Sequence, residues 1–121
     1  MNHPATLVEL DRSICEQLEV LERSSPGILR RLVDSFLSRR SHILGEAERH
    51  LRTPDLQALR MVAHSLKGSS ASLGATVLAA RAGEIERGAI RGDIATCERL
   101  LADLPALYAG AECALRAWVD R

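Results

Sequence analysis

The fold of this chain is decided by one stretch of sequence, Ala63-His64-Ser65-Leu66-Lys67-Gly68-Ser69-Ser70-Ala71-Ser72-Leu73-Gly74-Ala75. On a helix that turns about 100° per residue, with His64 at zero, mostly apolar side chains gather between roughly 160° and 240°. This core stripe consists of Leu59, Val62, Leu66, Ser70 and Leu73. The residues within about 60° of zero share the opposite face: Arg60, His64, Lys67, Gly68 and Ala71. The pattern predicts an amphipathic helix that holds the imidazole toward water.

Gly68 carries an energetic cost for which the sequence offers a functional reason. A glycine inside a helix costs about 1 kcal/mol relative to alanine, and no core packing requires one on a solvated face. One turn after His64, however, a missing side chain lets a bulky group approach the ring closely. Lys67 can place a mobile ammonium over the same spot, where it suits a phosphoryl group. We therefore assign Gly68 to steric clearance and Lys67 to stabilisation of phosphoryl charge.

The segment resembles the signature of histidine-containing phosphotransfer (HPt) domains. The resemblance rests on Ala63–Gly68, followed by Gly74-Ala75, Leu78 and Ile85-Glu86. It implies a phosphorelay carrier of a two-component system, with His64 as the phosphoacceptor. The implied donor is an aspartyl phosphate on the receiver domain of a hybrid sensor kinase, and the implied acceptor is the aspartate of a response regulator. Mg²⁺ is expected on the receiver, and no cofactor on this chain.

Five further residues are candidates for contact with a receiver: Arg60, Met61, Ser69, Ala71 and Glu86. Arg60 either adds a positive edge beside His64 or only solvates the helix. Met61 is either an exposed apolar contact or partly buried against a neighbouring helix. The resemblance implies polar groups at the positions of Ser69 and Glu86, but a carboxylate beside a phosphohistidine would repel it. For Glu86 we therefore expect a place on a solvated face.

Length and composition are typical of one helical domain over residues 1–121. The chain is 46% apolar, with one Trp, one Tyr and one Phe, which favours helices over strands. Its 16 basic and 16 acidic side chains cancel, so no basic surplus points to nucleic acid or to a membrane surface. Cys15, Cys97 and Cys113 have no metal or redox spacing. We expect a cytoplasmic monomer, and the initial Met favours a stand-alone protein.

Five helical segments are predicted: Thr6 to Arg23, Ser25-Pro26 to Leu51, Thr53-Pro54-Asp55 to Gly74, Thr76 to Ile90, and Ile94 to Trp118. The first begins either at Thr6, in a capping box with Glu9, or at Asp11. Ser25 caps the second ahead of Pro26, and Asp93 caps the last. Pro105 should kink the last helix or break it in two. The fold expected is all-α, an antiparallel four-helix bundle with an additional short N-terminal helix.

The chain has no Gly-rich nucleotide loop, which indicates a carrier that depends on its partners and not an enzyme. No second metal ligand lies three or four residues from His64, which argues against a metal site. Two alternatives stay open. One is a phosphoacceptor module that a chemotaxis-type kinase labels directly. The other is a helical adaptor that has the fold but transfers no phosphoryl group.

Overall fold

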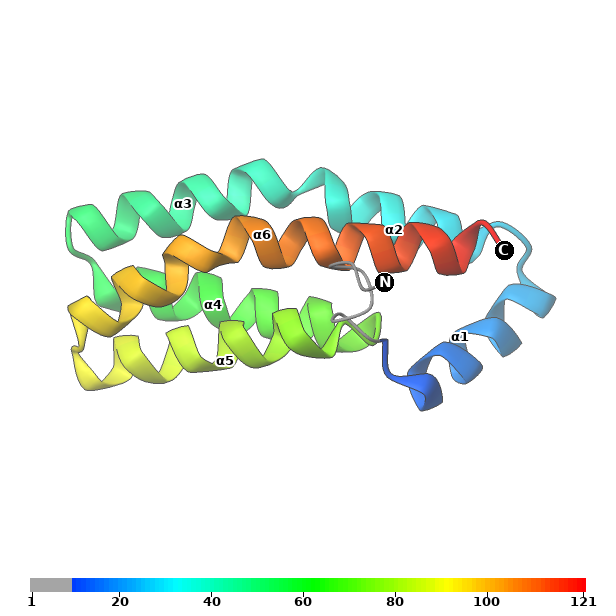
Figure 1. Ribbon diagram of the computed structural model, residues 1–121, viewed down its shortest axis with the longest axis horizontal. Helices are drawn as coiled ribbons and strands as arrows, with labels where there is room; N and C mark the ends of the chain where they lie inside the picture. Colours follow the sequence, from blue (N-terminus) through cyan, green and yellow to red (C-terminus); the bar gives the residue numbers. More distant parts are fainter. Residues whose placement is uncertain (1–9) are drawn as a thin grey trace, which may run out of the picture.

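The computed structural model describes residues 10–121, and all of its regular elements are helices, as predicted. Figure 1 shows α4 and α5 side by side, with α6 and the α2–α3 pair packed against them, and α1 leaning away at one end. This is the predicted four-helix bundle with its additional short N-terminal helix. The elements are α1 (Arg12–Ser24), α2 (Ile28–Ser38), α3 (Arg40–Arg52), α4 (Leu56–Ser72), α5 (Thr76–Arg91) and α6 (Ile94–Val119).

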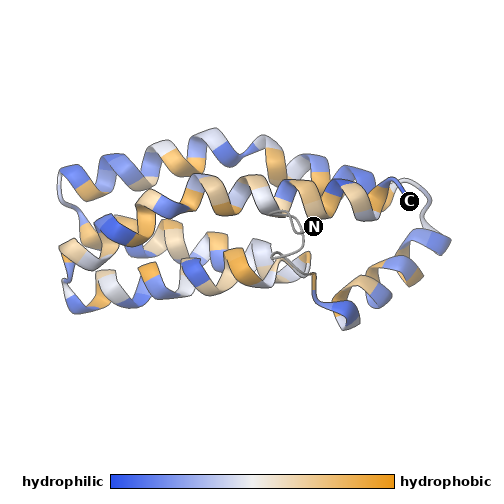
Figure 2. Ribbon diagram, in the orientation of Figure 1, coloured by the Kyte–Doolittle hydropathy of each residue, from blue (hydrophilic) through white to orange (hydrophobic). Residues whose placement is uncertain are grey.

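The core lies between α4, α5, α6 and the α2–α3 pair. The stripe predicted on α4 is buried at Leu59, Leu66 and Ser70, and its leucines belong to the same core cluster as Leu78 and Ile85 of α5. Each fully buried Leu or Ile side chain contributes about 1.5–3 kcal/mol of transfer free energy. In Figure 2 the hydrophobic positions alternate with hydrophilic ones along each of these helices, which is the pattern of an amphipathic bundle. The buried side of α4 is therefore fixed by packing, and its other side is left to solvent.

The prediction of one long second helix is wrong, because the segment is divided at Arg39 into α2 and α3. This residue has φ −92° and ψ 0°, and it separates α2 from α3. Arg40 would lie on the apolar face of one continuous helix. Because the chain turns at Arg39, the guanidinium of Arg40 instead donates to Glu112 of α6 at 2.9 Å and stays half-buried. The turn thus keeps a charged group out of the core.

Helix α1 begins at the later of the two predicted positions. Asp11 is its N-cap, and the Oδ1 atom accepts from the backbone N–H of Ile14 at 3.2 Å. The capping box proposed for Thr6 lies outside the described residues. The backbone N–H of Asp11 also donates to the carbonyl of Gly74 at 2.8 Å. Gly74, at the end predicted for this helical segment, has φ +76°, the left-handed conformation that favours glycine, and its turn ties α1 to the bundle.

The predicted cap of the second helix is wrong. Helix α2 begins at Ile28. Its N-cap is Gly27, which has φ +92° and no side chain that could accept a hydrogen bond. The missing acceptor comes from α1, where the Glu22 carboxylate accepts from the N–H groups of Gly27 at 2.8 Å and Leu29 at 3.0 Å. Ser25 and Pro26 instead belong to the α1–α2 connection. A residue five to seven positions earlier thus supplies the cap.

The remaining helix ends follow the sequence signals. Asp55 caps α4 and Asp93 caps α6, each through its carboxylate and a backbone N–H three residues later. Helix α6 continues through Pro105 without a break. Figure 1 shows α6 changing direction in its orange portion, so the proline kinks this helix and does not divide it.

Candidate functional site

The solvent-facing side of α4 carries the histidine that the sequence singled out. Ala63 and Leu66 are buried on either side of it in sequence, whereas 64% of the His64 side chain is exposed. Gly68 and Ala71 lie exposed on the same face, as the helical period predicts, and Lys67 is half-buried. The packing of α4 therefore fixes the backbone beneath an accessible imidazole.

Glu86 of α5 joins His64 and Lys67 into one hydrogen-bonded cluster. Its Oε2 lies 2.8 Å from His64 Nδ1, and its Oε1 lies 2.8 Å from Lys67 Nζ. Only 11% of the Glu86 side chain is exposed, so the solvated position expected for it is wrong. The resemblance implied a polar group at the position of Glu86, but the expectation of a solvated face did not consider that Lys67 could neutralise the carboxylate. Both carboxylate oxygens are occupied by partners from α4.

The charge of Glu86 determines which nitrogen of His64 carries a proton. The hydrogen bond from Lys67, followed by the one from His64, lowers the pKa of the Glu86 carboxyl below its ordinary value despite desolvation. An ionised carboxylate can only accept a hydrogen bond, so Nδ1 must be the donor. In the neutral ring the lone pair then resides on Nε2. The site thus presents one nucleophilic nitrogen, Nε2, on an exposed ring.

Gly68 lies in open space. A Cβ atom built on this residue would have no neighbour within 4 Å among residues 10–121. Packing against the described residues therefore does not require this glycine, and they offer no compensation for its cost in helix propensity. The space that it leaves lies one helical turn from His64.

The predicted docking residues lie in different environments. Met61 is 55% exposed and so is not buried against a neighbouring helix, while its contact with a receiver stays a prediction. Arg60 is half-buried and donates to Gln57 at 3.4 Å and to the sulfur of Met61 at 3.7 Å. The Ser69 hydroxyl donates to the carbonyl of Leu66 at 3.3 Å, back along its own helix. None of these three side chains takes part in the His64–Glu86–Lys67 cluster.

Gly83 of α5 was missed by the sequence reading. A Cβ atom on Gly83 would lie 3.3 Å from Cδ of Lys67, because the lysine stem passes over this glycine on its way to Glu86. The signal in the sequence was a glycine three residues before Glu86 within a helix. It could not be interpreted without the pairing of α4 with α5.

Two grooves flank α4 on the side of α2 and α3. Met61, Val62 and Ser65 line one groove together with His42 of α3. Ser69, Ser72 and Leu73 line the other, together with Leu18 of α1 and Phe36 of α2. Arg39, at the turn between α2 and α3, borders both. The exposed face of α4 is therefore continued by partly apolar surface toward α1, α2 and α3.

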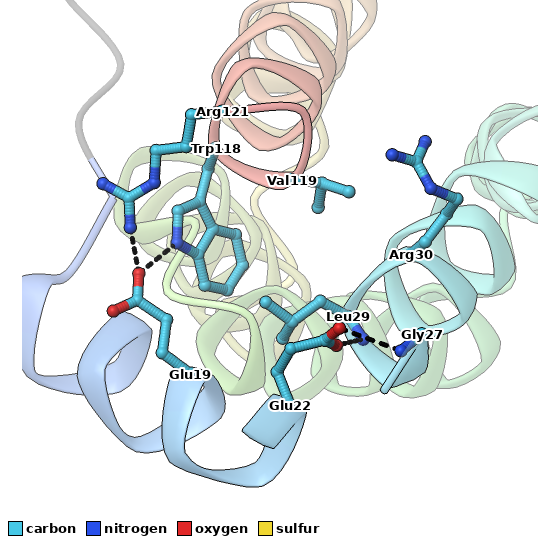
Figure 3. Close-up of a pocket in the computed structure, with 8 residues that line it drawn as sticks. All are labelled: Glu19, Glu22, Gly27, Leu29, Arg30, Trp118, Val119 and Arg121. Carbon is cyan, nitrogen blue, oxygen red and sulfur yellow. Dashed lines mark hydrogen bonds and ion pairs between the residues drawn. The ribbon is translucent and has the colours of Figure 1, made fainter. Parts of the chain in front are cut away.

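A separate cleft lies where α1, the start of α2 and the end of α6 meet (Figure 3). Glu19 accepts from Nε1 of Trp118 at 2.8 Å and also binds Arg121, while Glu22 caps α2. The acidic side chains that line this cleft are thus used to hold α1 against the rest of the bundle. None of its lining residues comes from α4.

Among residues 10–121, no group of three or more His, Cys, Asp and Glu side chains is arranged to hold a metal ion. No helix in this part of the chain combines the length and apolar character needed to cross a membrane.

Comparisons with known proteins agree on one family. The sequence pattern of the Hpt domain matches residues 31–117. The crystal structure of histidine-containing phosphotransfer protein B from Pseudomonas aeruginosa is similar over 89% of this chain and 91% of that one, with 31% identity and a TM-score of 0.78. The maize protein ZmHP2 is 23% identical over 92% of this chain and 83% of its own, with a TM-score of 0.81, and shares the fold. No curated protein matches.

Proposed function

The chain belongs to the Hpt domain family, whose members are phosphocarriers of phosphorelays and not catalytic enzymes, and from this premise we propose its particular role. His64 accepts a phosphoryl group from the aspartyl phosphate of one receiver domain. It then passes the group to the aspartate of a response regulator. The observation that carries this proposal is the exposed His64 ring, whose Nδ1 is held by Glu86 while Nε2 remains available.

The transfer step uses the lone pair that the site leaves on His64. Nε2 attacks phosphorus in line with the bond to the receiver's carboxylate oxygen. A P–N bond forms as the P–O bond breaks, and the receiver's carboxylate leaves with the electron pair. No proton has to move, because the proton stays on Nδ1, which keeps its hydrogen bond to the Glu86 carboxylate. The Glu86 carboxylate stabilises the positive charge that the phosphorylated ring acquires.

This arrangement removes the objection that a carboxylate would repel the phosphoryl group. Glu86 lies on the Nδ1 side of the ring, and Lys67 compensates its charge at 2.8 Å. In the second transfer the same step runs in reverse toward the carboxylate of the response regulator. Mg²⁺ bound to the receiver's own carboxylates would supply further neutralisation of the phosphoryl charge there.

The receiver has to approach His64 across the open side of α4. Gly68 leaves room beside the ring, since no atom of the described residues lies within 4 Å of where its Cβ would be. The exposed Met61 and Ala71 extend this face along the helix in both directions. The two grooves bordered by Arg39 adjoin the face and offer apolar surface for the partner. We assign receiver docking to this combined surface.

Incubation with a phosphorylated receiver domain tests the proposal. The wild-type protein should acquire acid-labile phosphate, and His64→Gln should acquire none. His50→Gln is the control, because His50 is also a helical histidine but lies on α3 and lines neither of the two grooves. Equal labelling of wild type and His64→Gln would exclude His64 as the acceptor. Labelling that requires a kinase domain and ATP, with no transfer from any receiver, would favour the chemotaxis-type alternative.

A further inference from the structure

Two basic side chains converge over Gly83. A Cβ atom built on this residue would lie 3.3 Å from Cδ of Lys67 and 3.5 Å from Nη1 of Arg87. Lys67 arrives from α4, whereas Arg87 folds back along α5 by one helical turn. The missing side chain of Gly83 thus allows the Arg87 guanidinium to lie beside the stem of the site lysine.

The two basic groups differ in their commitments. The Lys67 ammonium is bound to Glu86 at 2.8 Å, so its charge is largely compensated within the cluster. Arg87 is exposed, and none of the residues from 10 to 121 forms a hydrogen bond or an ion pair with its guanidinium. The other two arginines of α5 are engaged: Arg81 binds Glu84 and Asp103, and Arg91 lies 3.9 Å from Asp93.

At neutral pH a phosphoryl group on Nε2 adds a charge of roughly −2 to this cluster. The Glu86–Lys67 pair is already close to neutral and can supply little further compensation without breaking. An uncommitted guanidinium next to the lysine stem can supply it, since its planar fork binds two phosphoryl oxygens at once. The free charge of Arg87 therefore complements what the Lys67–Glu86 pair lacks.

We propose that Arg87 is a second cation of the phosphotransfer site, held over Gly83 so that it can bind the phosphoryl oxygens on His64. The proposal rests on the proposed function of His64. In this account Lys67 stays with Glu86 and keeps the imidazole oriented, while Arg87 contacts the transferred group. Gly83 contributes by leaving the space in which both side chains lie.

The test compares Arg87→Ala and Arg87→Lys with Arg91→Ala, which removes an equal charge from the next turn of the same helix. Two quantities are measured: the rate of transfer from a phosphorylated receiver to His64, and the lifetime of phosphohistidine after the receiver is removed. Arg87→Ala should slow transfer roughly three- to tenfold and shorten the lifetime. Arg87→Lys should restore part of both, and Arg91→Ala should leave both within about twofold of wild type.

The outcomes separate this proposal from the one on which it rests. If wild-type His64 is never labelled, the proposed function fails. If wild type is labelled normally and Arg87→Ala matches Arg91→Ala in both quantities, Arg87 is not part of the site. A slower transfer with an unchanged phosphohistidine lifetime would place Arg87 against the receiver and not against the phosphoryl group, which also overturns the proposal. The rate difference between wild type and Arg87→Ala should shrink as salt is raised.

Discussion

Oε2 of Glu86 lies 2.8 Å from Nδ1 of His64, across the interface between α5 and α4. A buried carboxylate is thus hydrogen-bonded to an exposed imidazole. It fixes the orientation of the ring and reserves Nε2 for chemistry. Lys67 completes the arrangement by compensating the charge of Glu86.

Substitution of Glu86 should change the tautomer of His64. In Glu86→Ala the ring loses its acceptor, so the population with the proton on Nε2 should increase, and the transfer rate should fall up to about tenfold. In Glu86→Gln the amide oxygen can still accept from Nδ1–H, so the tautomer should be largely retained. Histidine ¹⁵N NMR above neutral pH measures the tautomer directly. The same tautomer population in wild type and both variants would show that Glu86 does not orient the ring.

Substitution of Gly68 should separate partner access from stability. Gly68→Gln places a side chain in open space, so the helix should gain about 0.5 kcal/mol while transfer falls at least about tenfold. Gly45→Gln in α3 is the matched control, because a Cβ there also has no neighbour within 4 Å in the part of the chain that the structure describes. Both variants should unfold at slightly higher temperature than wild type. A normal transfer rate in Gly68→Gln would refute the role of Gly68 in clearance.

Acid should weaken the junction between α1 and α2. Hydrogen bonds from the backbone N–H groups of Gly27 and then Leu29 lower the pKa of the Glu22 carboxyl from 4.5. Because this pKa is lower in the folded state, the stabilisation is complete above pH 4.5 and is lost as the pH falls through the lowered value. Glu22→Gln should therefore lower the melting temperature at pH 7 by several degrees and have little effect near pH 2.

Glu16→Gln is the control for this prediction. Glu16 lies on the same helix and is exposed, and its carboxylate forms no hydrogen bond or ion pair with the described residues. Its substitution should leave the melting temperature almost unchanged at both pH values. A Glu22→Gln variant that melts like Glu16→Gln at pH 7 would mean that the carboxylate does not cap α2.

The hydroxyl of Tyr108 should be dispensable. The ring is fully buried in α6 and stacks on Phe36 with centroids 5.7 Å apart, but within the described residues its Oη has no hydrogen-bond partner. Burial also raises the pKa of this phenol to about 12. Tyr108→Phe should leave the free energy of unfolding unchanged or raise it by about 1 kcal/mol, whereas Tyr108→Ala should cost about 3–5 kcal/mol. Urea unfolding measures both, and a loss above about 1 kcal/mol in Tyr108→Phe would reveal a partner for the hydroxyl.

The sequence was sufficient for features that depend on one helix. The helical period alone placed His64 and Gly68 on the exposed side of α4 and Leu59 and Leu66 in the core. Asp93 was identified as a cap because the signal lies within three residues of its target. In each case the deciding contacts are local or follow directly from amphipathic packing.

The errors concern contacts between helices. Glu86 was expected on a solvated face, because its pairing with Lys67 depends on the register of α5 against α4, which the helical period does not specify. Glu22 replaced the expected cap because the α1–α2 connection folds back on α1. The turn at Arg39 likewise reflects a partner on α6, where Glu112 accepts from Arg40. Side-chain pairs across helices are thus what the pattern could not supply.

The central claim is that His64 carries the phosphoryl group on Nε2 while Nδ1 remains bonded to Glu86. Protein labelled with ¹⁵N in histidine, phosphorylated by a receiver domain, allows ³¹P and ¹⁵N NMR to identify the phosphorylated nitrogen. The account predicts one phosphohistidine, at His64, with phosphorus on Nε2 and a protonated Nδ1. Phosphorus on Nδ1, or on any residue other than His64, would contradict it.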